Sequence, residues 1–508
     1  MQYVDDFLNR ITMYRLVLWS LVGILLAALG ASFLGYMPFT PVALLVSTLF
    51  ILAVSIVSNA IFAKTFNAPV NVESVYITAL ILACIITPIA SKTDVDFIAF
   101  AFFASFIATA SKYVFAIGKK HVFNPAAIAV VATAFLMNYT ASWWVGTAAM
   151  LPFTFVAGFL IVRKTQREDL AYAFLAVATV FILAVSAGGI GGVPAYIVRL
   201  ALDTPIVFFA GVMLTEPLTT PPTRGLRICY GILVGLLFPP FVHVGSVYMT
   251  PELALVLGNV YSYIVSPKTK AMLTLKQKIR LTPSIYEFVF ASDKRFAFRP
   301  GQYLEWTLGH GNADDRGNRR YFTIASSPTD PDIRLGVKFY EQSSSFKRKL
   351  FFMKPGDRLA AGGLAGDFTL PKNRAERLVF IAGGIGVTPF VSMAKYLIDK
   401  NDRRDVTFLY SNPTQDDIAY RDVFEDARVK IGMKTVYALT RETGSVANSN
   451  FYAGRITGDM IRKFVPDFRG RHFYISGTRD MVTTCQAELA RIGVPSGRIT
   501  TDFFPGFA

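Results

Sequence analysis

Arginine, aromatic and hydroxyl side chains follow one another in the stretch Arg319–Pro328. The guanidinium of Arg320 suits a pyrophosphate, the ring of Phe322 can stack on an isoalloxazine, and the hydroxyl of Thr323 can reach the N5 edge of that ring. Such a strand is common in proteins, so by itself it leaves a purely structural role open. Together with Tyr321, these residues predict one side of a flavin site.

A second hydroxyl-rich stretch, Ser343–Phe346, follows about twenty residues later. Its hydroxyls and backbone N–H groups stand at a predicted helix start, which suits a phosphate. The residues assigned to the flavin site from this part of the chain are Lys338, Ser344, Ser345 and Phe346.

A glycine-rich turn, Ala382–Pro389, follows an apolar strand pattern and opens a helix pattern. Glycines allow a dinucleotide to approach the backbone, and a helix N-terminus favours its phosphates. A single turn of this kind is weak support, but its position after a flavin-type stretch strengthens it. The residues predicted to bind the nucleotide here are Gly383, Gly384, Gly386, Thr388 and Pro389.

The elements that would position these residues change in character near residue 377. Before it, short alternating runs separated by Pro and Gly predict an antiparallel β-barrel. After it, strands alternate with helices, which predicts an open α/β domain with a parallel sheet. The predicted barrel strands include 285–290, 303–308 and 333–340. The predicted α/β elements are 378–382, 389–400, 406–410 and 471–476.

Residues 270–508 resemble the ferredoxin-NADP reductase family. The family's Arg-x-Tyr-Ser/Thr flavin motif corresponds to Arg320, Phe322 and Thr323, with Phe in place of Tyr, so ring stacking is kept and the phenol hydrogen bond is lost. Its nicotinamide loop corresponds to 383–389. The resemblance implies FAD as the bound cofactor and NADH or NADPH as the substrate.

The late part of the chain extends this resemblance. Ser476-Gly477-Thr478 corresponds to the family's Cys-Gly-Pro turn, with serine in place of the cysteine near the hydride path. The end of the chain is similar to the aromatic terminus that covers the flavin. The resemblance therefore implies that Thr323, Ser476 and Phe507 lie closest to hydride transfer and that Gly477 contacts the nucleotide.

The preference between NADH and NADPH depends on the residues after the second strand of the sheet. Family members that prefer NADPH place basic residues there, around the 2'-phosphate. Here Ser411 and Asn412 are followed by Asp416 and Asp417, which favours NADH, while Arg441 leaves NADPH open.

The composition divides the 508 residues into two parts. Hydrophobic residues make up 53% and charged residues 17%, which is too apolar for an ordinary soluble enzyme, and the charges are sparse before residue 266. The net charge of +16 could suit nucleic acid, but the basic residues of the first half lie in short loops between apolar runs. That pattern predicts a lipid bilayer and no nucleic acid as partner. The 3 cysteines form no CxxC pair, so no iron–sulfur cluster or other metal site is expected.

Apolar runs long enough for spanning helices predict an α-helical polytopic membrane domain of about ten spans. Basic residues fall in alternate loops, so both termini are predicted to face the cytoplasm from the inner (plasma) membrane. The predicted spans are 14–36, 41–63, 73–90, 95–117, 124–139, 143–163, 169–187, 195–215, 226–245 and 250–265. The predicted domains are 1–265 (membrane), 266–375 (β-barrel, FAD) and 376–508 (α/β, nucleotide).

Three motifs in the first half resemble the RnfD/NqrB family of membrane subunits: Asn71–Ser74, His121–Ala126 and Leu214–Pro217. The resemblance implies a ten-helix membrane protein that carries a flavin. The family's outer-loop threonine for covalent FMN has no counterpart in 138–142, so a non-covalent FMN or riboflavin is expected. The residues assigned to this second flavin site are Asn124, Arg199, Thr215 and Glu216.

Two further patterns concern the membrane half. Arg199 and Asp203 are four residues apart and can pair on one helical face, either as part of a functional pathway or as a tie between helices. Only His121 and His243 of the 4 histidines lie in this half, so bis-heme ligation is excluded and no heme is expected.

These patterns predict a membrane-bound NAD(P)H-oxidising flavoprotein that passes electrons through FAD and a membrane flavin to a quinone or an extracytoplasmic acceptor. The alternative is a redox-driven Na⁺- or H⁺-translocating subunit of an Rnf- or Nqr-like complex with partner subunits. A third reading, a transporter regulated by a nucleotide-binding domain, predicts no bound flavin.

Overall fold

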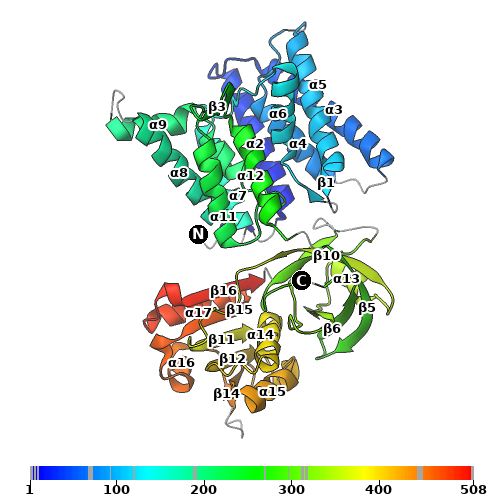
Figure 1. Ribbon diagram of the computed structural model, residues 1–508, viewed down its shortest axis with the longest axis vertical. Coiled ribbons are helices and arrows are strands. Elements are labelled where there is room, and N and C mark those ends of the chain that lie inside the picture. The colour runs from blue at the N-terminus through cyan, green and yellow to red at the C-terminus, as the bar shows by residue number, and fades with distance from the viewer. Residues whose placement is uncertain are drawn as a thin grey trace. The chain divides into compact units, whose positions relative to one another are not determined.

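The computed structural model divides the chain into two compact units, Met1–Ser266 and Pro267–Ala508 (Figure 1). We call them the N-terminal unit and the C-terminal unit and describe each by itself. The described residues are 4, 7–8, 11–66, 72–91, 93–117, 120–186, 192–267, 270–295, 297–310, 314, 318–442 and 450–504.

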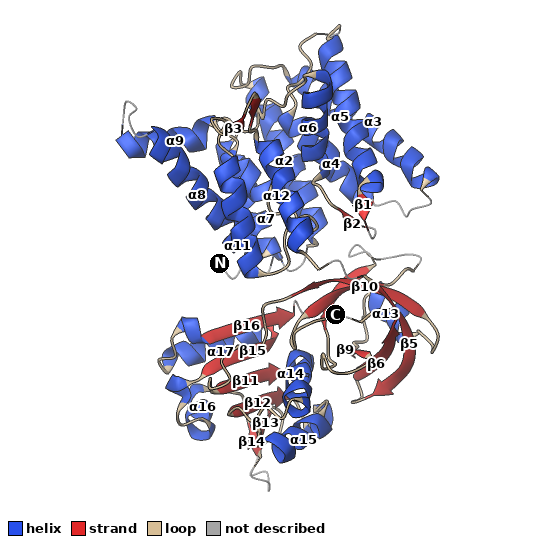
Figure 2. Ribbon diagram, viewed as in Figure 1, coloured by secondary structure: helices blue, strands red, loops and turns tan. Residues whose placement is uncertain are grey.

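The N-terminal unit consists of helices with two short hairpins (Figure 2). Its helices are α2 (Met13–Phe33), α3 (Pro41–Thr65), α4 (Val72–Ile85), α5 (Val95–Val114), α6 (Pro125–Met137), α7 (Leu151–Thr165), α8 (Glu168–Ser186), α9 (Gly192–Asp203), α10 (Ile206–Phe208), the π-helix η1 (Phe209–Met213), α11 (Arg224–Leu237) and α12 (Pro251–Val265). The hairpins are β1 (Ala116–Ile117) with β2 (Lys120–His121), and β3 (His243–Val244) with β4 (Val247–Tyr248).

Polar side chains mark where several of these helices begin. Thr40, Asn124 and Thr250 each accept a hydrogen bond from a backbone N–H of the first turn, and each is followed by proline at the start of the helix. Both features stabilise a helix start, because the cap satisfies a free donor and proline needs none. The cap at Asn124 also fixes this residue at the start of α6, where its side chain contacts Glu216.

Among the described residues, four helices are long and apolar enough to cross a membrane by length and composition, in place of the ten predicted spans: α2, α3, α5 and α8. Several others are shorter, and the 14 residues of α4 and of α11 each cover only about 21 Å of a hydrocarbon core of about 30 Å. The predicted span 195–215 is interrupted by Thr204 and Pro205, and it continues as α10 and η1. Apolar composition alone does not reveal such breaks.

Close backbone contacts hold the helices of this unit together. Gly211 of η1 lies directly against Gly158 of α7, and a Cβ built on Gly231 of α11 would lie 2.7 Å from a carbonyl oxygen of α8. Small residues at such crossings are typical of helices packed in membranes. Arg227 of α11 adds a charged tie, since its guanidinium donates to Asp169 of α8 at 2.7 Å.

The first part of the C-terminal unit is a six-stranded antiparallel sheet in the order β8-β7-β10-β5-β6-β9. Its end strands β8 and β9 form no ladder with each other among the described residues, so the predicted closed barrel is not confirmed. The elements are β5 (Ala271–Arg280), β6 (Ile285–Ser292), β7 (Tyr303–Thr307), β8 (Arg319–Thr323), β9 (Ile333–Lys338), α13 (Ser345–Phe351) and β10 (Arg358–Ala365).

The second part is a six-stranded parallel sheet in the order β14-β13-β12-β11-β15-β16. The chain starts at β11, builds outward to β14 and returns to the other side of β11 with β15, so the strand order reverses at β11. In open α/β sheets, ligands bind at the carboxyl ends of the strands beside such a reversal. The strands are β11 (Leu378–Gly383), β12 (Val406–Asn412), β13 (Lys434–Leu439), β14 (Phe451–Ala453), β15 (His472–Thr478) and β16 (Ile499–Phe504).

Helices cover both faces of the parallel sheet (Figure 2). The side chains of β11 alternate between two cores: Phe380 packs with α14 and α15, and Ile381 packs with α16 and α17. A strand buried on both faces reads as a continuous apolar run, which is why this sheet could be predicted. The helices are α14 (Thr388–Asp399), α15 (Arg421–Ile431), α16 (Gly458–Phe464) and α17 (Arg479–Arg491).

Two contacts join the two sheets within the C-terminal unit. The hydroxyl of Ser392 in α14 donates to the backbone oxygen of Ser326 at 2.7 Å in a fully buried position. A Cβ on Gly336 of β9 would lie 2.6 Å from the hydroxyl of Tyr420 and 2.8 Å from Thr388. Only glycine allows this approach, which sets the segment after β8 beside the start of α14.

Candidate functional site

Strand β8 presents its predicted site residues on two different faces. Arg320 lies 5.4 Å above the ring of Phe346, and the ring of Phe322 lies 5.9 Å from the same ring, so both point toward α13. Tyr321 points away, and its hydroxyl donates to Glu305 at 2.9 Å. The structure thus brings Arg320, Phe322 and Phe346 together and leaves the predicted contact Tyr321 outside this group.

Arg320 and the start of α13 form a cradle for an anion. The guanidinium of Arg320 donates to one carboxylate oxygen of Asp314 at 3.1 Å, and the backbone N–H of Ser345 donates to the other at 2.9 Å. Ser344 caps the helix by accepting from the N–H of Lys347. Two donors from different elements therefore converge on one anionic group, which is the donor set that a flavin pyrophosphate needs.

Thr323 follows at the end of β8 and is 2% exposed. Its hydroxyl has no hydrogen-bond partner within the described part of the chain. A buried hydroxyl without a partner is costly, so it fits a group that a bound ligand would supply. Arg320, Phe322, Thr323 and Ser345 together suit FAD in both charge and polarity.

Lys338 does not share this cradle. Its ammonium lies 5.7 Å above the ring of Tyr340, and its backbone carbonyl accepts from Lys347 at 2.9 Å. Phe507, which was predicted to lie close to hydride transfer, is outside the described residues.

The glycine-rich turn after β11 packs against the turn after β15. A Cβ built on Gly386 would lie 2.5 Å from the carbonyl oxygen of Ser476 and 2.6 Å from the Cα of Gly477. Gly384 has a φ of +51°, and the sulfur of Met481 lies directly against Gly383. Both turns lie at the carboxyl ends of neighbouring strands beside the reversal of strand order, which is the expected place for a nucleotide.

The helix start beyond this turn is also as predicted. Thr388 and Pro389 are the first two residues of α14, and the hydroxyl of Thr388 donates to the carbonyl of Ile385 at 3.3 Å. Ser476 is fully buried, and its hydroxyl has no partner among the described side chains and backbone groups. The predicted hydride-path residue is therefore adjacent to the predicted nucleotide turn and has a free hydroxyl.

Two polar residues near the site, Asn412 and Asp314, were not assigned to it from the sequence. Asn412, at the carboxyl end of β12, is 2% exposed and neither atom of its side-chain amide has a partner within the described ranges. Its place at a strand end could have marked it as a ligand contact, whereas the role of Asp314 depends on loop geometry that no sequence pattern shows. The loop after β12 carries Asp416 and Asp417, and Asp417 accepts from Thr414 at 2.9 Å. Glu442, which follows β13, lies beside this loop and accepts from the N–H of Gln415 at 3.1 Å.

Asn124, Thr215 and Glu216 meet in the N-terminal unit. The amide of Asn124 donates to the carboxylate of Glu216 at 3.0 Å, and all three residues line one pocket between α2, α4, α6 and α7. The pocket has a volume of about 60 Å³, far below the several hundred Å³ of typical cofactor sites. An isoalloxazine does not fit this pocket as it stands, although its polar residues are those predicted.

Arg199 does not line that pocket, so its assignment to the second flavin site stays a prediction. It is exposed on α9, whereas Asn124 and Thr215 are buried. Arg199 and Asp203 form no ion pair, so the i, i+4 spacing overestimated their contact. On an apolar helix, exposed charges at this spacing can extend away from each other to reach polar surroundings.

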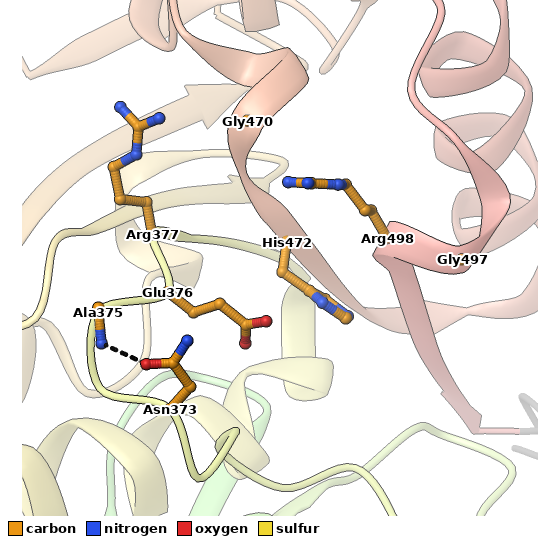
Figure 3. Close-up of a pocket in the computed structure, with 8 residues that line it drawn as sticks. All are labelled: Asn373, Ala375, Glu376, Arg377, Gly470, His472, Gly497 and Arg498. Atoms are coloured by element: carbon orange, nitrogen blue, oxygen red, sulfur yellow. Dashed lines mark hydrogen bonds between the residues drawn. The ribbon is translucent and has the colours of Figure 1, made fainter.

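A separate pocket of about 490 Å³ opens at the amino end of the parallel sheet. Glu376, His472 and Arg498 line it just before or at the start of β11, β15 and β16 (Figure 3). Burial lowers the pKa of His472. This pocket is at the opposite strand ends from the glycine turns and does not belong to the nucleotide crevice. Within the described ranges, no group of three or more His, Cys, Asp or Glu residues could hold a metal ion.

Comparisons with known proteins concern the C-terminal unit. A family described as oxidoreductase NAD-binding domain matches residues 380–487. The glycine betaine monooxygenase reductase subunit of Pseudomonas aeruginosa is 26% identical over 229 residues, 44% of this chain and 62% of that protein. Flavohemoprotein A of Dictyostelium discoideum is 24% identical over 45% of this chain and 58% of that protein. NADH-cytochrome b5 reductase 2 of Mycosarcoma maydis is 31% identical over 31% of this chain and 46% of that protein. The chain thus spans about three fifths or less of the length of these relatives.

Solved structures resemble the same part of the chain. The FAD/NAD-binding domain of the nitric oxide dioxygenase from Vibrio cholerae is 18% identical, with a TM-score of 0.42 over 46% of this chain and 98% of that one. The cytochrome b5 reductase domain of Ulva prolifera nitrate reductase is 23% identical, with a TM-score of 0.41 over 47% and 98%. The sequence relatives are oxidoreductases, and together with the matched family they confirm an oxidoreductase-type NAD-binding domain in the C-terminal unit.

Proposed function

We propose that this protein is a membrane-bound oxidoreductase that oxidises NADH through FAD held in the C-terminal unit. The observation that carries the proposal is the contact between the turns at Gly386 and Ser476, at the carboxyl ends of adjacent parallel strands. The two turns are so close that residue 386 has no room for a side chain. The hydroxyl of Ser476, which has no partner among the described residues, lies at this crevice. The matched NAD-binding family spans both turns.

The residues divide the work by position. Arg320 and the N–H of Ser345 bind and orient the diphosphate, while Phe322 provides a ring for the isoalloxazine. The buried hydroxyls of Thr323 and Ser476 are placed to hydrogen-bond the reacting rings. When bound, FAD accepts two electrons as hydride and releases them singly.

The acidic loop after β12 supports NADH as the coenzyme. A carboxylate accepts a hydrogen bond from a ribose 2'-hydroxyl and repels a 2'-phosphate. Asp416, Asp417 and Glu442 gather on this loop and its neighbour. We expect kcat/KM to be higher for NADH than for NADPH. Asp416→Arg should lower the ratio of kcat/KM for NADH to kcat/KM for NADPH by about tenfold, the effect of one charge contact. Equal efficiencies in the unaltered enzyme would contradict this assignment.

The N-terminal unit is proposed to anchor the enzyme in the inner membrane with both termini in the cytoplasm. Its four long apolar helices support membrane insertion. A quinone or an extracytoplasmic acceptor would then receive the electrons. The RnfD/NqrB resemblance suggests a second flavin, FMN or riboflavin, as a relay, but the small pocket beside Glu216 does not support it. The proposed boundaries are 1–265, 266–375 and 376–508.

The decisive experiment uses the full chain purified in detergent. We expect bound FAD, bleaching of its absorbance by NADH, and loss of FAD on replacing Arg320 by Ala. Extraction and chromatography of the flavins count FAD against FMN and riboflavin. A colourless chain that does not oxidise NADH or NADPH with any acceptor would refute the proposal, and FAD as the sole flavin would remove the membrane relay.

A second candidate function, redox-driven ion translocation with partner subunits, is favoured by ionisable groups among the helices, of which Glu252 is buried and Lys112 is half-buried. Glu252 of α12 is 2% exposed and accepts from the indole of Trp143 at 3.0 Å, while Lys112 of α5 donates to the backbone of Ser74 at 2.7 Å. Ionisable residues inside a helical membrane unit often serve ion movement. Proteoliposomes that build an ion gradient during NADH oxidation would support this function, and NADH oxidation without a gradient would exclude it.

A further inference from the structure

A carboxylate of the chain itself fills the anion cradle at Arg320. One oxygen of Asp314 accepts from Arg320 at 3.1 Å, and the other accepts from the N–H of Ser345 at 2.9 Å. The N–H of Asp314 donates to the hydroxyl of Ser345 at 2.9 Å, and His310 lies 3.0 Å from that hydroxyl. Asp314 is therefore bound to the cradle by its side chain and by its backbone.

The arrangement matches the chemistry of a phosphate. Carboxylate and phosphate oxygens accept the same charge-assisted hydrogen bonds, and the guanidinium fork of arginine suits both. The side chain of Arg320 is only 16% exposed and that of Asp314 is 29% exposed, so solvent screens the pair only in part. Two anions on the same donors would repel each other, and each donor can serve only one of them well.

We propose that Asp314 is an internal competitor for the flavin diphosphate: it occupies the Arg320–Ser345 cradle in the cofactor-free chain and must leave when FAD binds. The inference rests on the proposed function, in which this cradle holds the diphosphate. Asp314 would therefore lower the affinity only for flavins that carry phosphate groups. A flavin with phosphate groups has to displace the carboxylate, whereas riboflavin has no group for the cradle and leaves Asp314 in place.

The competitor also keeps Arg320 paired before the cofactor arrives. A mostly buried guanidinium is more stable beside an anion. Asp314 supplies that anion in the cofactor-free chain, as the diphosphate would in the loaded chain. The exchange lowers the net affinity for FAD and lets the folded chain persist without it. Removing the carboxylate should therefore weaken the empty form and strengthen FAD binding.

The test measures flavin binding to the full-length chain in detergent after removal of bound flavin. Asp314→Asn keeps the shape of the side chain and removes its charge. We expect it to bind FAD about tenfold more tightly, the effect of about one charge-assisted contact, and to bind riboflavin unchanged. The matched control is Asp332→Asn, which removes the same charge at the residue before β9, where Asp332 pairs with Lys276 of β5 at 2.8 Å.

Several outcomes would overturn the competitor role: weaker or unchanged FAD binding by Asp314→Asn, equal tightening of FAD and riboflavin, or the same shift in Asp332→Asn. A second measurement covers a cofactor-free variant that is too unstable to titrate. In that case Asp314→Asn should lower the melting temperature of the empty chain and leave that of the FAD-loaded chain unchanged, and a decrease in both forms would contradict the proposal.

Arg320→Ala separates this inference from the proposed function. If Arg320→Ala binds FAD as well as the unaltered chain, the flavin site itself is wrong and the competitor role fails with it. If Arg320→Ala loses FAD while Asp314→Asn behaves like the unaltered chain, the flavin site stands and only the competitor role is wrong.

Discussion

At the scale of single residues, two of the buried hydroxyls without partners among the described residues lie at the proposed site. Thr323 and Ser476 are at most 2% exposed, and neither hydroxyl has a partner within the described ranges. Leaving a buried polar group unsatisfied costs about 1–3 kcal/mol. The two groups lie at the ends of β8 and β15, where the flavin and the nicotinamide are proposed to meet. A ligand that satisfies both hydroxyls explains why the chain keeps them.

Thr323→Val tests this explanation. Valine keeps the shape and removes a hydroxyl that makes no hydrogen bond to any described residue, so the protein should remain folded and keep its FAD. We expect the rate of flavin reduction by NADH to fall about tenfold, the effect of one lost hydrogen bond, as measured by stopped-flow absorbance. Thr435→Val is the matched control, because its hydroxyl is also buried without a partner but lies on β13. Equal rates in both variants would contradict a role for Thr323.

At the scale of elements, the contact between two turns sets the nucleotide crevice. Gly386→Ala would push a methyl group to 2.5 Å from the backbone oxygen of Ser476, and backbone atoms cannot move aside cheaply. We expect KM for NADH to rise at least about tenfold while FAD remains bound, since the cradle at Arg320 is on another element. Gly497→Ala is the control, because nothing lies within 4 Å of the added carbon. An unchanged KM for Gly386→Ala would show that the nucleotide binds elsewhere.

Some of these elements could be predicted from the sequence, and others could not. The parallel sheet was predictable because β11 is an apolar run buried on both faces, and the glycine turn follows it directly. The faces of β8 were not, because a motif does not say that Tyr321 turns toward Glu305. The helical unit was misjudged where hydropathy continues across a break, as at Pro205 between α9 and α10.

Contacts between residues that are far apart in the sequence are not visible to sequence analysis. Asp314 meets Ser345 across 31 positions of the chain, and Asn124 meets Glu216 across 92. The motifs led to Asn124 and Glu216 individually, but they also included Arg199, which lies elsewhere. Only the folded chain decides which polar groups converge.

At the scale of the whole molecule, the stability of the C-terminal unit should depend on pH through His472. Burial lowers the pKa of this imidazole below its ordinary value of about 6.5, so the unfolded chain binds the proton more readily. The folded state is therefore fully favoured above pH of about 6.5 and loses stability as pH falls below it. We expect the urea midpoint to decrease from pH 8 to pH 5.5, and His472→Gln to reduce that decrease. If the urea midpoint of His472→Gln decreases as much between pH 8 and pH 5.5 as that of the unaltered protein, other groups cause the pH dependence.

Because the pocket beside Glu216 is too small for a flavin relay, the prediction for the polar cluster of the N-terminal unit concerns electron delivery to the proposed quinone. Glu216 accepts from Asn124 at 3.0 Å and from Thr219 at 3.2 Å, and Glu216→Gln removes the charge while it keeps the shape. Because this cluster is in the other unit, NADH should reduce FAD and ferricyanide at unchanged rates in the variant. Reduction of a membrane quinone in proteoliposomes should fall about tenfold, the effect of one charged contact. Glu73→Gln, at the first turn of α4, serves as the control within the same unit. If Glu216→Gln slows ferricyanide and quinone reduction equally, the N-terminal unit does not carry the path to the acceptor.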